Sequence, residues 1–125
     1  MRLLLDTHVL LWSVMDDRRL AGPVRDHLVD GRNQVLVSAA SAWEISIKRV
    51  LGKLRAPDDL REQIELARFD PLAITFEHAE AVGELPAHHG DPFDRMLVAQ
   101  ALFEGLTIVT HDEQIGRYDV DVLLV

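Results

Sequence analysis

The sequence predicts an α/β protein, a three-layer α/β/α sandwich around a central, mainly parallel sheet. Two observations lead to this fold class: short apolar runs alternate with helical segments, and Leu3–Leu5 is apolar at every position. A strand buried on both faces of a parallel sheet has such a continuous apolar run, and strands that alternate with helices build parallel sheets. The chain has 125 residues, of which 48% are hydrophobic and 27% charged. We therefore expect one globular domain spanning residues 1–125.

The first elements follow from apolar runs and helix-terminating residues. Leu3–Leu5 is the first predicted strand, and Thr7–Met15 is a short helix that follows it. A second helix begins near Gly22–Pro23, because proline suits the first helical position, and it ends at Gly31. Val35–Val37 is the second predicted strand.

A longer helix follows the second strand, capped by Ser38 and ended by Gly52 after Leu51. Apolar side chains recur on one of its faces at helical spacing: Trp43, Ile47, Val50 and Leu51. This pattern is typical of a helix packed on a sheet, so we expect these four side chains to be buried.

The second half of the chain repeats the alternation of helix and strand. It predicts, in order, a helix over Pro57–Arg68, a strand over Leu72–Ile74, a helix capped by Thr75 and ending near Leu85, a polar loop over Pro86–Gly90, a helix from Asp91–Pro92 to Gly105, and strands over Leu106–Thr110 and Val120–Val125.

Composition excludes several classes of protein. The chain has no cysteine, which excludes disulfides, a thiolate nucleophile and cysteine-based zinc sites. We find no long apolar run and no leader-like N-terminus, so we expect a cytoplasmic protein without a membrane span or signal peptide. The formal net charge is −8. That charge by itself argues against binding to nucleic acid, which usually needs a basic surface.

Four acidic residues from distant segments are predicted to meet at one edge of the sheet. Asp6 directly follows the first strand, and Asp112 lies two residues beyond the strand that ends at Thr110. The helix that begins at Asp91 leads into that strand, so its first turn, with Asp94, lies at the same edge. Glu44 lies in the second turn of its helix and leans toward the N-terminus. Ligands bind at this edge in α/β folds.

Each acid also has a structural interpretation. Asp6 and Asp91 are suitable helix N-caps, Asp94 suits the first helical turn, Asp112 suits a turn, and Glu44 is spaced to pair with Lys48. Carboxylates that meet at one edge repel one another unless a cation lies between them. Mg²⁺ or Mn²⁺ prefers such oxygen ligands, activates a bound water and stabilises displacement at phosphorus.

The chain resembles the PIN-domain ribonucleases, specifically the VapC-type toxins of bacterial toxin–antitoxin pairs. The resemblance spans nearly the whole chain and rests on four ordered blocks: Leu3–His8, Ser41–Lys48 with Leu51–Leu54, Asp91–Arg95, and Ile108–Asp112. It implies a PIN-like fold and cleavage of RNA that depends on Mg²⁺ or Mn²⁺. It also implies inhibition by a small antitoxin protein, and a homodimer.

Carried over by motif, Asp6, Glu44, Asp94 and Asp112 match the family's acidic metal-binding residues. Asp112 completes the site or holds a second metal, and Asp91, an extra acid in the same block as Asp94, ranks below it. Secondary candidates are Thr110, Arg95, which could orient an acid or contact phosphate, and Lys48, which begins the basic stretch that ends at Arg55.

The remaining histidines and aromatic residues receive simpler interpretations. His88 and His89 lie in a polar loop and are expected to be an exposed pair, while His8 and His111 flank the acids in sequence. Four aromatic residues have helical spacings typical of a core: Trp12, Trp43, Phe93 and Phe103.

Other functions fit the sequence less well. A phospho-acceptor signalling domain needs paired acids after the first strand and a late lysine, and no lysine follows Lys53. A haloacid-dehalogenase-like phosphatase needs Asp-x-Asp, where this chain has Asp6-Thr7-His8. A non-catalytic RNA- or protein-binding PIN-like module remains the alternative. Two divalent ions bound at the acidic cluster would halve the chain's net charge of −8 and make the cluster attractive to phosphate. We therefore expect the activity to depend strictly on a metal.

Overall fold

The centre of the protein is a five-stranded, all-parallel sheet in a computed structural model that describes residues 1–125. The strand order is β3-β2-β1-β4-β5, so the first strand lies in the middle and pairs with two partners. The strands are β1 (Arg2–Leu5), β2 (Gln34–Ser38), β3 (Asp70–Leu72), β4 (Thr107–Thr110) and β5 (Val122–Leu124). The prediction of a parallel sheet is confirmed.

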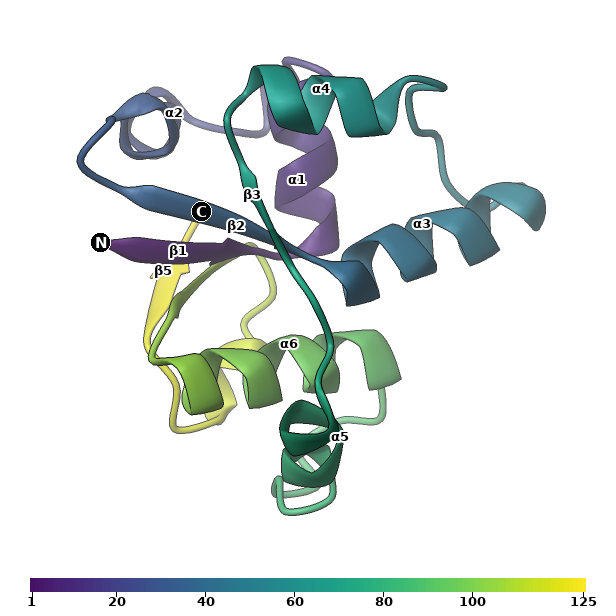
Figure 1. The fold of residues 1–125 in the computed structure, drawn as a ribbon, viewed down its shortest axis with the longest axis vertical. Helices are drawn as coiled ribbons and strands as arrows, with labels where there is room; N and C mark the ends of the chain where they lie inside the picture. Colours follow the sequence, from purple (N-terminus) through teal and green to yellow (C-terminus); the bar gives the residue numbers. More distant parts are fainter.

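Six α-helices cover the two faces of this sheet and one of its edges. They are α1 (Thr7–Val14), α2 (Gly22–Val29), α3 (Ala39–Val50), α4 (Leu60–Leu66), α5 (Phe76–Val82) and α6 (Pro92–Glu104), and a 3-10 turn spans Ile115–Arg117. Helices α1, α2 and α4 lie on one face and α6, with α5 packed on it, lies on the other (Figure 1). The three-layer architecture is therefore the one that the sequence predicts.

The three leucines of β1 enter two separate cores, as a strand buried on both faces requires. Leu3 and Leu5 pack with α1, α2 and the odd-numbered valines of β2, whereas Leu4 packs with Leu36, Ile108 and α6. All three leucines are fully buried. These cores hold β1 rigidly between β2 and β4, and thereby fix the direction in which the chain leaves its C-terminal end.

Several element boundaries differ from the predicted ones. The predicted helix over Pro57–Arg68 is limited to Leu60–Leu66, and the helix expected to end near Leu85 stops at Val82. The predicted strand over Leu72–Ile74 lies two residues earlier, because Asp70 pairs with Leu36 in the parallel register of β2. Its Pro71 is tolerated because β3 is an edge strand.

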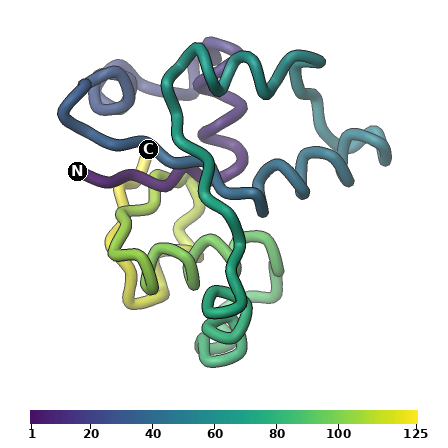
Figure 2. Tube along the Cα trace, viewed as in Figure 1, coloured from purple at the N-terminus to yellow at the C-terminus, as the bar shows by residue number.

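The apolar stripe of α3 is not buried against the sheet, so this prediction was wrong. Trp43, Val50 and Leu51 are 59%, 87% and 60% exposed, and Ile47 is exposed as well. Helix α3 leaves the end of β2 and runs away from the sheet, as the chain trace also shows (Figure 2). Only its first turns reach α1 and α6, so its buried side chains lie on another face: Ala40, Ser41, Glu44 and Ile45.

No helix in the structure combines the length and apolar character that crossing a membrane requires.

Candidate functional site

The strand order changes direction at β1, so the connections that follow β1 and β4 lead to opposite sides of the sheet from neighbouring points on its carboxyl edge. From β1 the chain passes to β2 and β3 on one side, and later returns to β4 on the other side of β1. Asp6 follows β1 and Asp112 lies two residues beyond β4. Ligand sites of open parallel sheets form at such a point, where the strand order reverses.

Asp6 is held at this edge by hydrogen bonds to both of its carboxylate oxygens. As the N-cap of α1, it accepts a hydrogen bond from the Val9 amide at 2.8 Å through Oδ1. The Thr110 hydroxyl donates to Oδ2 at 2.5 Å. Burial raises the pKa of Asp6, and the hydrogen bonds from Thr110 and Val9 oppose that rise. The expected capping role is therefore real, and it fixes the orientation of a buried carboxylate.

Glu44 is fixed in a similar way from α3. Its side chain is only 4% exposed, its Oε1 accepts a hydrogen bond from the Thr7 hydroxyl at 2.6 Å, and its Oε2 lies 2.5 Å from Lys48 Nζ. The hydrogen bond with Glu44, followed by the nearby charges of Glu44, Asp91 and Asp94, raises the pKa of Lys48. The pairing of Glu44 with Lys48 thus forms as the spacing predicts, but it points into the site rather than into solvent.

Asp94 is the carboxylate at which the other acids converge. Asp91 caps α6 and accepts hydrogen bonds from the amides of Phe93 and Asp94, so Asp94 lies in the first turn of that helix. The Asp94 carboxylate itself accepts no hydrogen bond from the chain, and burial raises its pKa to about 7, with further increments from Asp91, Asp6, Glu44 and Asp112. Four distant segments therefore bring their carboxylates within electrostatic range of one another.

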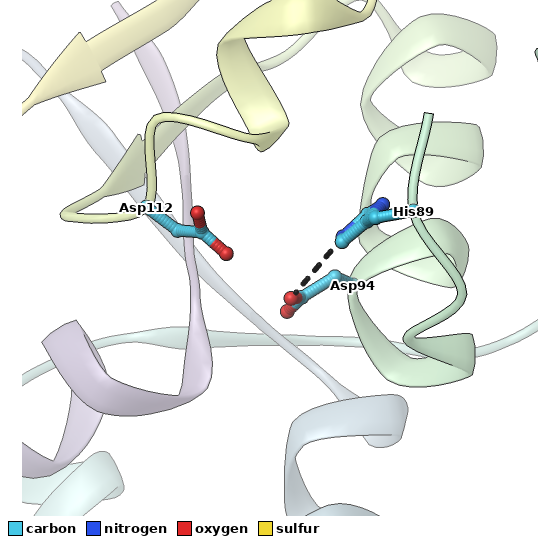
Figure 3. A group of neighbouring side chains, drawn as sticks. All are labelled: His89, Asp94 and Asp112. Carbon is cyan, nitrogen blue, oxygen red and sulfur yellow. Dashed lines mark ion pairs between the residues drawn. The ribbon is translucent and has the colours of Figure 1, made fainter. Parts of the chain in front are cut away.

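His89 joins this group, although the sequence predicted an exposed histidine pair. Ligand atoms of His89, Asp94 and Asp112 all lie within 4.8 Å of one another (Figure 3). His88 is exposed as expected, but the His89 side chain is only 10% exposed, and its Nε2 lies 3.5 Å from Asp94 Oδ2. Hydrophobic periodicity gives no information about a loop residue such as His89. The only sequence feature that linked it to the site was its position two residues before Asp91.

The secondary candidates separate into residues that reach the acids and one that does not. Thr110 and Lys48 contact Asp6 and Glu44, as described above. The Arg95 guanidinium instead donates to Tyr118 Oη and to three backbone carbonyls, that of Val82 at the end of α5 and those of Leu85 and Pro86 in the loop that follows. Arg95 therefore makes no direct contact with the acids, and its two predicted roles, orienting an acid or contacting phosphate, stay predictions.

An open cleft of about 590 Å³ adjoins the acids. It is lined by Asp6, His8, Trp12, His111, Asp112, Glu113, Gln114 and Arg117. Trp12 is buried, as predicted for a core residue, and the His111 ring lies edge-on to it at 5.6 Å between centroids. Trp43 and Phe103 are more than half exposed, so their predicted core positions were wrong.

The donor set fits a hard divalent cation. It consists mainly of carboxylate oxygens, which Mg²⁺ and Mn²⁺ prefer. The pKa of Asp94 is raised first by burial and then by the neighbouring acids, and a bound cation would oppose both effects. The His89 Nε2 atom, which has no hydrogen-bond partner, faces the same space.

Comparison with known proteins agrees with this geometry. The family model for the PIN domain matches residues 3–121. The chain belongs to the PIN domain family. No curated protein matches the sequence at a significant level. Figure 1 thus shows the fold of a PIN domain, with helices on both faces of its parallel sheet.

Solved structures share this fold over nearly their whole length. The chain is similar to VapBC2 from Rickettsia felis bound to a promoter DNA fragment, with a TM-score of 0.74, 15% identity, and coverage of 99% of this chain and 98% of that chain. It is similar to DNA-bound VapBC from Salmonella typhimurium, with a TM-score of 0.73, 18% identity, and coverage of 98% and 97%. A toxin–antitoxin complex from Klebsiella pneumoniae gives a TM-score of 0.65, 19% identity, and coverage of 96% and 94%. These similarities establish the PIN fold.

Proposed function

We propose that this PIN domain is a metal-dependent endoribonuclease and the toxin of a toxin–antitoxin pair. The observation that carries the proposal is the convergence of Asp6, Glu44, Asp94 and Asp112 around one space, with the pKa of Asp94 raised to about 7. A cluster that holds this much uncompensated negative charge is suited to binding a cation. Membership of the PIN domain family supports the same function.

The four carboxylates would hold Mg²⁺ or Mn²⁺, directly or through water. The bound metal would polarise the scissile phosphate and lower the pKa of the attacking water. The chain's own contribution is orientation: Thr110 and Val9 fix the Asp6 carboxylate, and Thr7 fixes the Glu44 carboxylate. Both acids therefore present their oxygens without having to reorganise when substrate arrives.

The substrate strand would lie in the cleft beside Asp6 and Asp112. Its walls combine the cationic Arg117 with the imidazoles of His8 and His111, groups that contact phosphates and stack on unpaired bases. Lys48, which pairs with Glu44, would add a positive charge close to Asp91 and Asp94. Since the chain as a whole carries a charge of −8, RNA affinity should depend on these few cations and on the metal.

Two protein partners are part of the proposal. Four exposed apolar side chains on α3 and its C-cap offer a surface that a second copy of the chain or an antitoxin would cover: Trp43, Ile47, Val50 and Leu51. The negative net charge suits a basic antitoxin segment, and similarity to toxin–antitoxin complexes supports such a partner.

Cleavage of total RNA by the purified chain, with Mg²⁺, Mn²⁺ or EDTA and with mapped cut sites, tests the nuclease function. We expect cleavage only with a divalent ion. Asp6→Asn and Asp94→Asn should each reduce cleavage at least about 100-fold, since each removes a proposed metal ligand. Asp119→Asn, at an exposed acid outside the cluster, is the control for charge.

Full activity in EDTA or in Asp94→Asn would contradict the proposed chemistry. RNA binding without cleavage under every metal condition would instead favour the alternative function, a non-catalytic binding module.

A further inference from the structure

One buried side-chain nitrogen in the protein has no hydrogen-bond partner, and it lies at the carboxylate cluster. This atom is His89 Nε2, on a side chain that is nine-tenths buried. It lies 3.5 Å from Asp94 Oδ2, slightly beyond hydrogen-bond length (Figure 3). Buried polar atoms are almost always bonded, so an unbonded one calls for a functional explanation.

The other ring nitrogen of His89 is held by a chain of donors that begins at Arg95. The Arg95 guanidinium, which has donors only, donates to Tyr118 Oη at 3.1 Å, and Tyr118 Oη lies 2.8 Å from His89 Nδ1. Tyr118 is buried, and His89 Nδ1 is the acceptor available to its hydroxyl proton. The neutral imidazole therefore accepts at Nδ1 and carries its own proton on Nε2, the nitrogen that faces Asp94.

The Arg95 guanidinium, where this series of hydrogen bonds begins, is itself held in place. Its guanidinium also donates to three backbone carbonyls, those of Val82, Leu85 and Pro86. These bonds fix the loop that carries His89 to the first turn of α6. Arg95 and Asp94 are neighbours in sequence but point in different directions on the helix, so Arg95 reaches the cluster only through Tyr118 and His89.

We propose that Arg95, Tyr118 and His89 form a hydrogen-bond relay that sets the tautomer of His89 and directs its Nε2–H to the Asp94 carboxylate. His89 is thereby a positioning residue for Asp94. The inference rests on the proposed function, because it treats Asp94 as a metal ligand. The Asp94 carboxylate has no hydrogen bond from the chain that fixes it elsewhere, so a small side-chain rotation brings Oδ2 to hydrogen-bond distance.

With His89 included, each of three acids in the cluster has a neutral side-chain donor beside it. The Thr110 hydroxyl donates to Asp6, and the Thr7 hydroxyl donates to Glu44. His89 is the donor at the corresponding place beside Asp94. Donors of this kind orient the carboxylates of metal sites.

Direct coordination of a metal by His89 is disfavoured by the same geometry. Coordination through Nε2 needs the reverse tautomer, in which Nδ1 donates to Tyr118 Oη. Tyr118 Oη would then accept from both His89 and Arg95, and its own proton would be left without an acceptor in a buried position.

Mn²⁺ binding to the full chain, measured by calorimetry, tests the relay independently of cleavage. His89→Phe keeps a ring but removes the donor, and we expect its Mn²⁺ dissociation constant to rise about 10–100-fold. His89→Gln keeps an N–H near the position of Nε2 and should recover most of this loss. Tyr118→Phe frees the tautomer and should give an intermediate loss.

The matched control is His88→Phe, which changes the adjacent, exposed histidine and keeps a ring beside Tyr118. Its Mn²⁺ affinity should be unchanged. Thermal melting in EDTA establishes that each variant is folded. Nitrogen-15 spectra of the metal-free chain, recorded at about pH 8 where imidazole is neutral, identify which ring nitrogen of His89 carries the proton.

Three results would overturn the relay: a proton on Nδ1, an unchanged Mn²⁺ affinity in folded His89→Phe, or a His89→Gln variant that binds no better than His89→Phe. Absence of Mn²⁺ binding by the unaltered chain would instead overturn the proposed function itself. The two failures are therefore distinguishable.

Discussion

Asp6 and Glu44, which we call the anchored side of the carboxylate cluster, accept a hydrogen bond at every carboxylate oxygen, whereas Asp94 on the open side accepts none. The donors to the anchored side are the Val9 amide, Thr110, Thr7 and Lys48. The open side comprises Asp94, Asp112 and the unpaired Nε2 of His89. Asp112 accepts one hydrogen bond, from the Gln114 amide, so the contrast is sharpest between the fully bonded carboxylates of Asp6 and Glu44 and the unbonded carboxylate of Asp94.

This difference indicates which part of the cluster the fold stabilises and which part a ligand would stabilise. Hydrogen bonds to a buried carboxylate offset much of its desolvation. Without them, burial and four neighbouring acids raise the pKa of Asp94 to about 7. The metal-free protein thus stores unfavourable electrostatic energy at the open side, and a bound cation would release it.

The largest expected effect is that matched substitutions on the two sides change the free energy of unfolding in opposite directions. An acid whose pKa is raised by folding destabilises the folded state above that pKa, so Asp94→Asn should increase the free energy of unfolding at about pH 8 by roughly 2–4 kcal/mol. Glu44→Gln should decrease it by about 1–2 kcal/mol, because Lys48 loses its charged partner. Urea unfolding in EDTA measures both.

Asp119→Asn, which removes an exposed charge, is the control and should change the free energy of unfolding by less than about 0.5 kcal/mol. If Asp94→Asn and Glu44→Gln shift stability in the same direction, the distinction between the anchored and open sides is wrong.

The next effect is a pH dependence of metal affinity that arises from the open side. Below about pH 7 Asp94 is increasingly protonated, and that proton must leave before the carboxylate can hold a cation. The apparent Mn²⁺ affinity should therefore be constant at higher pH and fall about tenfold per pH unit below 7. Calorimetry at several pH values, in buffers of different ionisation enthalpy, measures both the affinity and the released proton.

A metal affinity that stays constant between about pH 8 and pH 6 would show that the Asp94 carboxylate does not take part in binding.

The convergence of the four acids could be predicted from the sequence because it follows from topology alone. In a parallel sheet, residues that follow strands share an edge with the first turns of helices that lead into strands. This rule is enough to bring Asp6, Asp94 and Asp112 together, and the lean of helical side chains adds Glu44. The rule gives neither hydrogen-bond partners nor pKa values, so the difference between the anchored and open sides needed the structure.

Two errors have a common physical cause. The burial of His89 depends on Tyr118, which packs on its loop from a distant segment, and local sequence carries no trace of that contact. The stripe of α3 that includes Trp43 and Val50 is apolar, but periodicity says only that a face is apolar, not what covers it.

The smallest effect concerns a single hydroxyl group on the anchored side. Thr110→Val removes the hydroxyl that donates to Asp6 and accepts from the Asp112 amide, while the shape of the side chain is kept. We expect the free energy of unfolding to fall by about 1–2 kcal/mol when urea unfolding is measured in EDTA, because two hydrogen bonds with a usual net value near 1 kcal/mol each are lost. Thr107→Val, on the same strand and without a side-chain hydrogen bond, should leave it nearly unchanged. Equal losses in the two variants would mean that β4 packing, rather than the bond to Asp6, accounts for the effect, and that Asp6 is no better anchored than Asp94.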